Sequence, residues 1–472
     1  MRNHSEWKFI ALLFCTAIAI GSPAQTFTTL VDFNRAKDGA YPYYESLVQG
    51  VDGNYYGTTW QGGYLQCDGT NEGCGTVFKV TPEGLHITLY NFCTQINCAD
   101  GGYPYGGLVQ GTDGSFYGMT SIGGSGNSGT IFKVTPTGKL TILCSFDITN
   151  GSSPTSALTL TIDGNFYGTT SLGGEYGFGT VFKMTPGGSL KTLYSFCSQR
   201  GCPDGAYPTG TLVQATDGSL YGTTVQGGSG EGFGTVFKIS LTGTLITLHS
   251  FDGSDGSSPH AGLFQANDGN FYGTTETLGS SGGGTVFRMA RNGTLTTLHN
   301  FKKDAGAPSG GLIQATDGNI YGTTSRGGDN GNVGTIYSIN STGALTTLYN
   351  FGLGHGAWPF GGLLQATNGA LYGTTYRGGS SNDGTVYSLS TGLGPFASLV
   401  RKASKIGQPE GILGQGFTGT TSVSFNGTPA SFTVVSDTFI RATVPAGATT
   451  GYVTVTTPSG TLTSNVPFYV LP

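Results

Sequence analysis

The sequence predicts an all-β protein, a seven-bladed β-propeller followed by an immunoglobulin-like β-sandwich. The first observation is a segment that recurs seven times: a D-G turn, an aromatic residue, Y-G-T-T, a glycine-rich loop, G-T-V-F and a strand such as L-T-T-L-Y. The second is its period near 50 residues, typical of stacked units that cannot bury their apolar faces alone. The third is a change of pattern after Pro395, where short alternating runs replace the repeat.

The first six repeats each show the pattern of four short antiparallel strands, which is typical of one propeller blade. In the third repeat these strands are predicted at 157–161, 166–170, 180–185 and 190–196. Asp163-Gly164 supplies the positive φ angles of a tight hairpin turn. A parallel β-helix is the competing architecture, but its coils are shorter and lack alternating hairpin turns. The glycine of Y-G-T-T marks the seven copies, at Gly57, Gly118, Gly168, Gly222, Gly273, Gly322 and Gly373.

The two ends of the repeat array predict a closed ring. Residues 27–33 match the fourth strand of a blade, whereas the seventh repeat shows only three strands, at 362–365, 370–375 and 385–389. The N-terminal strand can therefore complete the last blade and remove an unpaired sheet edge. We accordingly predict a propeller at 25–394 and a sandwich at 395–472.

The strand directions sort the loops onto two faces of the predicted ring. The D-G turns and the T-P-x-G turns share one face, and they are short and uniform. The glycine-rich loops and the connections between blades share the other face, which carries all the variation in length. Because variable loops on a rigid scaffold commonly form binding sites, we expect the function on this second face.

Aromatic and arginine side chains gather in the loops of this second face. An aromatic residue precedes proline in four connections between blades, and Ser153, Ser258 and Ala307 take its place in the other three. Such rings can stack on sugar faces or anchor a peptide. The alternative is that they wedge adjacent blades together. The candidate ligand-binding residues are Tyr41, Trp60, Tyr103, Tyr207, Arg326, Trp358 and Arg377.

The sequence assigns no catalytic residue and predicts no cofactor. The Asp of the D-G turn recurs in six repeats, which indicates turn chemistry, because a catalytic group is needed only once. A Gln on the first strand recurs as well and is expected to bind backbone groups between blades or to line the channel. His260 and His355 fall near connections between blades and are the acid–base candidates. No G-x-S-x-G, H-E-x-x-H or phosphate-binding motif is present.

The N-terminus and the cysteines predict export. Residues 1–24 combine Arg2 and Lys8 with a short apolar run and small residues, which is typical of a signal peptide. Cys144 is expected to be a buried free thiol. Six other cysteines form three pairs that are close in sequence. These pairs lack histidines at ligand spacing, so loop disulfides are preferred to a metal site. The predicted disulfides join Cys67 with Cys74, Cys93 with Cys98, and Cys197 with Cys202.

Charge excludes two classes of partner. The chain has a net charge of -5 and no basic block, so neither nucleic acid nor an anionic membrane surface is expected to bind. No second apolar run of spanning length follows the leader, so no membrane span is expected in the mature chain.

Two resemblances extend these predictions. The D-G-x-x-Y-G-T-T-x-x-G-G and G-T-V-F-K pattern over 27 to about 391 resembles the GloVer tandem repeat of secreted bacterial proteins with varied C-terminal anchors. The stretch G-Q-G-F-T-G-T-T-S-V-S-F-N-G-T-P-A-S-F resembles an IPT/TIG domain, which implies an immunoglobulin-like fold with an adhesion or spacer role. Neither resemblance brings catalytic residues.

Three functions are compatible with the sequence. The first is a secreted or cell-surface binding protein that presents the variable face to a carbohydrate or protein ligand. The second is a lyase or hydrolase at the propeller mouth; the layout is loosely similar to propeller lyases that open cyclic peptide antibiotics. The third is a structural component of a surface layer. A histidine within hydrogen-bond reach of a carboxylate at the mouth would favour the enzyme.

Overall fold

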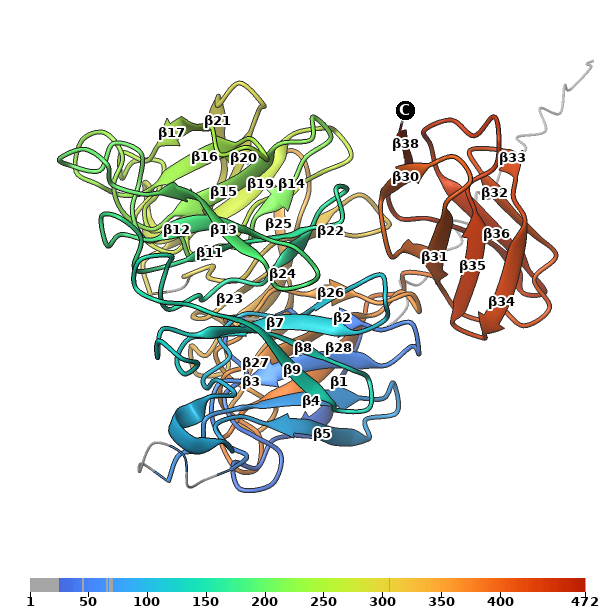
Figure 1. Ribbon diagram of the computed structural model, residues 1–472, viewed down its shortest axis with the longest axis horizontal. Helices are drawn as coiled ribbons and strands as arrows, with labels where there is room; N and C mark the ends of the chain where they lie inside the picture. Colours follow the sequence, from blue (N-terminus) through green and yellow to red (C-terminus); the bar gives the residue numbers. More distant parts are fainter. Residues whose placement is uncertain (1–24, 45, 65–66, 68–70, 305, 472) are drawn as a thin grey trace, which may run out of the picture.

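The computed structural model describes residues 25–44, 46–64, 67, 71–304 and 306–471. The predicted signal peptide, residues 1–24, lies outside the described residues. The described chain is all-β, and its one helical segment is the short 3-10 turn η1 (Ile96–Cys98). Within these ranges no helix is long and apolar enough to cross a bilayer. Figure 1 shows the repeats on one side and the C-terminal strands beside them.

Each repeat forms one antiparallel sheet of four strands, and the repeats are numbered here in chain order. Repeats 1 to 3 contain β2 (Val48–Gln49), β3 (Tyr55–Thr59), β4 (Thr76–Val80), β5 (His86–Asn91), β6 (Val109–Gln110), β7 (Phe116–Thr120), β8 (Thr130–Val134), β9 (Leu140–Ser145), β10 (Thr159–Leu160), β11 (Phe166–Thr170), β12 (Thr180–Met184) and β13 (Leu190–Ser195). Repeats 4 to 6 contain β14 (Val213–Gln214), β15 (Leu220–Thr224), β16 (Thr235–Ile239), β17 (Leu245–Ser250), β18 (Phe264–Gln265), β19 (Phe271–Thr275), β20 (Gly282–Met289), β21 (Leu295–Lys302), β22 (Ile313–Gln314), β23 (Ile320–Thr324), β24 (Thr335–Ile339) and β25 (Leu345–Asn350).

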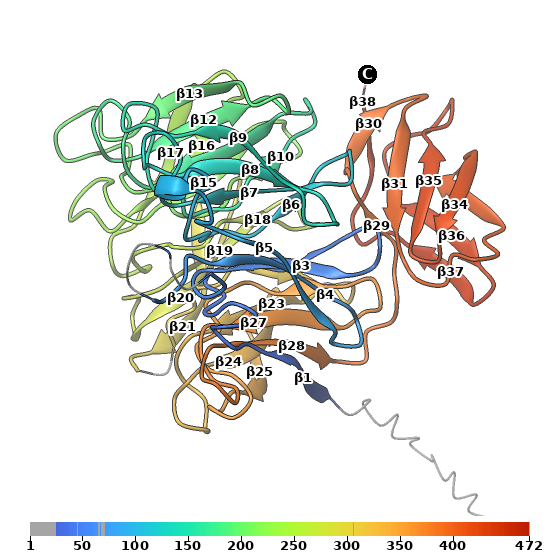
Figure 2. The same cartoon turned by 60° about the horizontal axis from the view of Figure 1, so that its bottom comes forward.

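The sheet of repeat 7 takes its outer strand from the N-terminal end. Repeat 7 supplies β26 (Leu364–Gln365), β27 (Leu371–Thr375) and β28 (Thr385–Ser390), and β1 (Thr26–Asp32) pairs antiparallel with β28. The ring of Phe27 stacks on Tyr349 of repeat 6 at 3.8 Å between centroids. Figure 2 shows β1 beside β28, so the two ends of the repeat array meet in one sheet.

The first strand is shorter than predicted in repeats 3 and 7, at Thr159–Leu160 and Leu364–Gln365. In repeat 3 the pairing covers only β10, not the whole of 157–161, because the chain before it bonds to a neighbouring repeat. The amide of Ala157 donates to Thr211 Oγ1 of repeat 4 at 3.0 Å. The other three predicted strands of this repeat agree with the structure to within one residue at either end.

The residues that recur in every repeat make contacts that stabilise its sheet. The last threonine of Y-G-T-T shares a hydroxyl–hydroxyl hydrogen bond with the threonine of G-T-V-F in every repeat, at 2.8–2.9 Å. The glycine makes room for the third-strand aromatic: a Cβ on Gly118 would lie 2.6 Å from Phe132 Cζ. These contacts fix the register of the second and third strands.

The D-G turn is tied to the strand that follows it. In repeats 1 to 6 the tyrosine of Y-G-T-T donates its hydroxyl to the turn aspartate, as Tyr221 does to Asp217 at 2.8 Å. In repeat 7 Asn368 Nδ2 donates instead to the Tyr372 hydroxyl. The turn aspartates therefore hold each turn against the strand that follows it.

The glutamine that recurs on the first strand bonds to the preceding repeat. The Thr216 amide of repeat 4, for example, donates to Gln265 Oε1 of repeat 5 at 2.9 Å.

Apolar cores lie between consecutive repeats rather than within single sheets. Tyr221 of repeat 4, for example, stacks on Phe271 of repeat 5 at 4.1 Å. A further core brings Val31 and Phe33 together with Tyr55 of repeat 1 and Tyr372 of repeat 7. Burial of these faces is the main stabilising contribution, at roughly 25 cal/mol per Å² of apolar surface.

The C-terminal module is a β-sandwich with its own core. Its sheets are β29 (Ser398–Leu399), β31 (Pro409–Leu413), β35 (Phe439–Thr443) and β34 (Phe432–Ser436), and β33 (Thr428–Pro429), β32 (Ser422–Phe425), β36 (Val453–Thr457) and β37 (Gly460–Thr463). A parallel pair joins β30 (Ala403–Lys405) to β38 (Tyr469–Leu471). Ile412, Phe425 and Val453 are among the fully buried side chains between the sheets.

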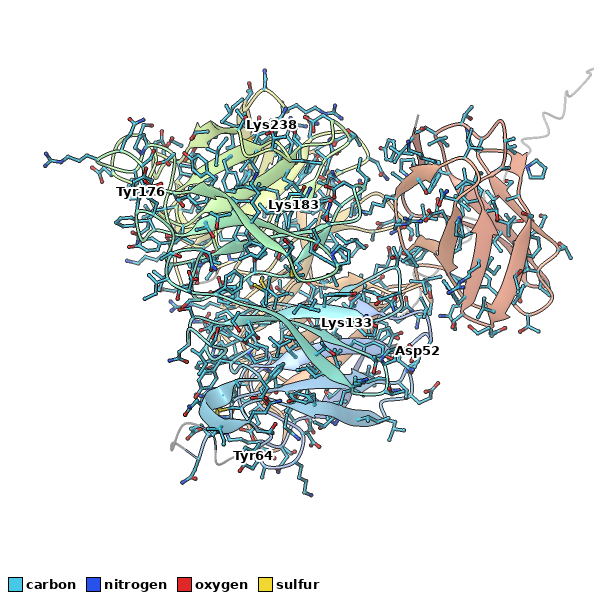
Figure 3. The ribbon with its side chains drawn as sticks, viewed as in Figure 1. Asp52, Tyr64, Lys133, Tyr176, Lys183 and Lys238 are labelled. Carbon is cyan, nitrogen blue, oxygen red and sulfur yellow. A yellow bond between two sulfur atoms is a disulfide. The ribbon has the colours of Figure 1, made fainter. Side chains whose placement is uncertain are left out.

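The sandwich contacts the D-G turns of repeats 1 and 7. Thr438 Oγ1 donates to the carbonyl of Val51 at 3.2 Å, and Gln415 Nε2 donates to Thr367 Oγ1 at 2.9 Å. Figure 3 shows Asp52 near the sandwich, with Tyr64 and Tyr176 of the glycine-rich loops on the far side. The variable face therefore points away from the sandwich.

The glycine-rich loops and connections carry the disulfides. The structure joins Cys67 to Cys74, Cys93 to Cys98 and Cys197 to Cys202, with Cα atoms 6.0, 4.1 and 4.1 Å apart. Cys144 is free, as predicted, but it is only half-buried, because its strand is the outermost of its sheet. Burial raises the pKa of its thiol.

Candidate functional site

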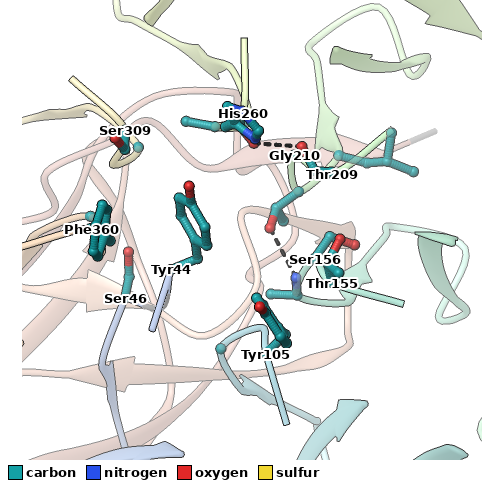
Figure 4. Close-up of a pocket in the computed structure, with 18 of the residues that line it drawn as sticks. Tyr44, Ser46, Tyr105, Thr155, Ser156, Thr209, Gly210, His260, Ser309 and Phe360 are labelled. Carbon is teal, nitrogen blue, oxygen red and sulfur yellow. Dashed lines mark hydrogen bonds between the residues drawn. The ribbon is translucent and has the colours of Figure 1, made fainter. Parts of the chain in front are cut away.

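A cavity of about 610 Å³ opens where the first strands of all the repeats begin (Figure 4). Each repeat contributes the residue that follows the proline of its connecting loop. This position holds five different residue types in the seven repeats, whereas the proline before it recurs in all of them. The residues are Tyr43, Tyr105, Thr155, Thr209, His260, Ser309 and Phe360.

The backbone aims these side chains at the cavity. The residue before each proline has a positive φ, between 51° and 62°. In repeat 2 the amide of Tyr103 donates to the carbonyl of Cys74 in repeat 1 at 2.8 Å. The carbonyl of Tyr103 accepts from the amide of Ser121 at 3.1 Å. The same pair of bonds recurs in every repeat. This left-handed residue therefore links two repeats, and the proline fixes the direction of the residue after it.

The open end of the cavity is called the mouth, and one side of it is aromatic. Tyr43 lies at its centre, with its ring 4.9–6.1 Å from those of Trp60, Tyr105, Phe360 and Tyr376. These five residues, from repeats 7, 1 and 2, are called the aromatic side. Burial raises the pKa of Tyr105 to about 12, so its hydroxyl stays protonated and able to donate at neutral pH.

The opposite side carries the ionisable groups and is called the polar side: His260, Glu276 and Ser309. His260 Nε2 lies 3.0 Å from Glu276 Oε2, and Ser309 Oγ donates to Glu276 Oε1 at 3.3 Å. Burial lowers the pKa of His260, against the opposing effect of Glu276. A neutral imidazole that donates from Nε2 leaves Nδ1 as an acceptor. The side chains of His260 and Glu276 are 27% and 23% exposed.

Tyr44 reaches across the cavity between the two sides. Repeat 1 has one more residue than repeat 2 between the proline and the buried leucine, Pro42 to Leu47 against Pro104 to Leu108. The Tyr44 ring lies 6.0 Å from that of His260 with 15° between their planes, and 5.6 Å from that of Phe360. Burial strongly raises the pKa of its hydroxyl. Figure 4 shows it in the middle of the lining residues.

The candidate ligand-binding residues lie around the cavity and not in its lining. Trp60 belongs to the aromatic side, and the ring of Tyr103 lies 5.7 Å from it. Tyr207 packs on Phe178 between repeats 3 and 4, and Arg326 is exposed.

Tyr41, Trp358 and Arg377 form one stack behind the aromatic side. Arg377 Cζ lies 5.0 Å from the centre of the Tyr41 ring and 5.9 Å from that of Trp358. Tyr41 is buried and also bonds to Arg35. Four of the predicted aromatics (Tyr41, Tyr103, Tyr207 and Trp358) occupy the linking position before proline, which favours the wedge interpretation.

The two histidine candidates differ in their surroundings. His260 lines the cavity beside a carboxylate, the arrangement that favours an enzyme, whereas His355 is exposed and lies outside the lining. Sequence reasoning missed Tyr43, Tyr44, Tyr105, Glu276 and Phe360. The signal for most of them is the variable position after each proline; Glu276 occupies the variable position after Y-G-T-T.

The described residues bring three potential metal ligands together, the sulfur atoms of Cys67, Cys74 and Cys93, within 4.8 Å of one another. All three belong to disulfides, so none offers the thiolate that a metal requires.

Comparisons with known proteins agree with the resemblances. A model of the Gloeobacter/Verrucomicrobia repeat matches residues 16–163, 64–267, 160–307 and 214–428, and a model of the IPT/TIG domain matches 398–470. No curated protein matches the chain.

Solved structures are similar at low identity. The extracellular domain of a hybrid two-component system of B. thetaiotaomicron is 11% identical with a TM-score of 0.51; the alignment covers 96% of this chain and 60% of that one. A gluconolactonase of Xanthomonas campestris is 14% identical (60% and 84% covered, TM-score 0.38). A PQQ-bound aldose sugar dehydrogenase of Streptomyces coelicolor is 16% identical (61% and 93% covered, TM-score 0.39). Such likenesses bear on the fold alone. By the repeat that spans most of its length, the chain belongs to the Gloeobacter/Verrucomicrobia repeat family and ends in an IPT/TIG domain.

Proposed function

We propose that this chain is an exported binding protein whose repeats close into a seven-bladed propeller and whose mouth binds a carbohydrate. The observation that carries the proposal is the mouth cavity, with an aromatic side facing a polar side. Aromatic rings offer a flat apolar surface for a sugar ring at low entropic cost, and hydroxyl and imidazole groups satisfy the sugar hydroxyls. Cavities of several hundred Å³ are typical of small-ligand sites.

Ring closure is supported by the contacts between repeats 7 and 1. Tyr55 lies 4.1 Å from Tyr372, and the Thr367 amide donates to Gln49 Oε1 at 3.0 Å. The pairing of β1 with β28 covers the edge of β28 and gives repeat 7 the same four strands as the other repeats. A closed ring is what gathers one variable residue from each repeat around a single cavity.

Export is supported by the predicted signal peptide and by the loop disulfides, which persist in oxidising compartments. The sandwich contacts the face opposite the mouth, so a spacer or docking role for it leaves the mouth free.

A glycan array tests the carbohydrate proposal. The mature protein is compared with Tyr105→Ala, which removes a ring of the aromatic side, and with Tyr176→Ala, which removes an exposed ring on a glycine-rich loop outside the lining. We expect wild type and Tyr176→Ala to bind the same saccharides, and Tyr105→Ala to bind them at least about tenfold more weakly. Equal binding by all three, or no saccharide bound at all, overturns the proposal; a protein ligand then becomes the better candidate.

The contact between His260 and Glu276 favours a second candidate, an enzyme acting at the mouth. Glu276 orients the imidazole and leaves Nδ1 as a base, the arrangement used for proton transfer. The test incubates the retained saccharides with wild type and with His260→Gln and follows products by mass spectrometry. Product formation that His260→Gln abolishes while binding persists supports the enzyme, and unchanged saccharides remove it.

A further inference from the structure

Among the described residues, one carboxylate, that of Glu276, contacts side chains that line the cavity. The cavity lining, as far as the structure describes it, includes no Lys, Arg, Asp or Glu side chain. Glu276 adjoins this lining, in contact with His260 and Ser309, and its side chain is partly exposed. Its charge also raises the pKa of Tyr43 and Tyr44, although burial contributes more in each case. Its field therefore reaches both sides of the mouth.

No compensating cation faces Glu276 among the described contacts. His260 is neutral at pH 7, because burial lowers its pKa below the ordinary value. Arg35 is paired with Glu72 and Asp383 at the rim. Arg377 is held over Tyr41, Trp358 and Tyr376, behind the aromatic side. The cavity thus presents a partly buried negative charge to its ligand.

Glu276 is also particular to its repeat. The residue after Y-G-T-T is Trp60, Ser121, Ser171, Val225, Ser325 or Tyr376 in the other repeats. Its amide makes the same bond as the others, to the carbonyl of Ser258. The scaffold therefore accepts small, branched and aromatic side chains here, and the carboxylate is not needed to build the fold.

We infer that the mouth selects saccharides that carry an ammonium group, and that Glu276 determines this preference. The inference rests on the proposed carbohydrate binding. The sugar ring packs on the aromatic side, and its amino group lies on the polar side, where Glu276 accepts a charge-assisted hydrogen bond. A uronate carboxylate in the same place is repelled, because a partly buried charge is poorly screened.

The test compares three forms of the same oligosaccharide backbones. Gluco-, galacto- and manno-configured tetramers are prepared in amino, neutral and uronate forms and titrated against the mature protein. We expect the amino form of a bound backbone to bind on the order of tenfold more tightly than the neutral form, and the uronate form to bind most weakly. In Glu276→Gln the affinities for the three forms converge, because the charge that distinguishes them is removed; the readout is the ratio between the forms and not the affinity for any one of them.

The matched control is Glu231→Gln, which removes the same charge from an exposed glycine-rich loop on the same face. It is expected to keep the wild-type order, and thermal unfolding checks that both variants are folded. Equal binding of amino and neutral forms, a preference for uronates, or an unchanged order in Glu276→Gln overturns the inference but leaves carbohydrate binding standing. If no form of any oligosaccharide binds, both the proposed function and this inference fail.

Discussion

At the scale of single residues, the aspartate of the D-G turn stabilises each repeat. Asp217 accepts hydrogen bonds from the Tyr221 hydroxyl at 2.8 Å, the Ser219 amide at 3.0 Å and Lys238 Nζ at 2.9 Å. We expect Asp217→Ala to lower the free energy of unfolding by about 1–3 kcal/mol, measured by urea denaturation. Asp217→Asn should cost less, because Asn368 fills this place in repeat 7. Equal midpoints for wild type and Asp217→Ala would contradict the assignment.

The same aspartate makes stability depend on pH. Burial alone would raise the pKa of Asp217, but the bonds from Lys238, Ser219 and Tyr221 together lower it below the ordinary value. A carboxyl with a depressed folded-state pKa stabilises the protein above its unfolded pKa, near 3.9, and this contribution is lost as pH falls toward the folded-state value. We expect the stability difference between wild type and Asp217→Asn to shrink as pH is lowered from about 5 to about 2. A constant difference over that range would refute this.

Residue identities at the site were partly predictable. The recurring Asp, Thr and Gly could be assigned to structure, because repetition argues against a catalytic or binding role. The contacts of Tyr44 could not, because they depend on how far one extra residue carries a side chain across a closed cavity. Nor could the pairing of His260 with Glu276, which are 16 positions apart in sequence and lie on different loops.

At the scale of elements, the Cys197–Cys202 loop has two restraints. The disulfide closes the loop, and Asp204 accepts from the Tyr194 hydroxyl at 2.8 Å and the Cys197 amide at 3.0 Å. Since the chain-entropy contribution of so short a loop is about 2 kcal/mol, we expect Cys197→Ser/Cys202→Ser to speed hydrogen exchange within 197–205 and to leave β12 and β13 protected. Exchange that spreads to these strands would show that the disulfide supports the whole sheet.

The N-terminal strand is the element that closes the sheet of repeat 7. Removal of residues 25–33 takes Phe27 from its contacts with Tyr349 and Tyr387 and exposes the edge of β28. We expect the shortened protein to unfold at a much lower temperature and to aggregate, since an unpaired edge recruits other strands. Removal of the sandwich, residues 395–472, serves as the comparison and should leave the repeats folded. A shortened protein as stable as wild type would contradict ring closure.

The bounds of a strand could be predicted where its sequence motif recurs in every repeat. They could not where contacts with a neighbouring repeat determine which residues pair. Y-G-T-T and G-T-V-F place the second and third strands to within one residue in repeat 3. The first strand of repeat 3 was predicted too long, because contacts with the next repeat take over its hydrogen bonding.

At the scale of the whole molecule, the two faces of the repeats form different surfaces. The uniform D-G face meets the sandwich, and the variable face forms the mouth. The period predicts this arrangement from the sequence, because equivalent loops must lie on the same face. The cavity itself needs the structure, since it is assembled from side chains of all seven repeats.

The most direct test uses tryptophan fluorescence. The predicted mature chain has two tryptophans, Trp60 at the aromatic side and Trp358 behind it. In a Trp358→Phe protein, titration with a saccharide retained on the array should change the Trp60 emission with a saturable curve. Tyr105→Ala should weaken that curve at least about tenfold, and Tyr176→Ala should leave it unchanged. Saturable binding that leaves Trp60 emission constant and ignores Tyr105→Ala would show that the ligand binds elsewhere than the mouth.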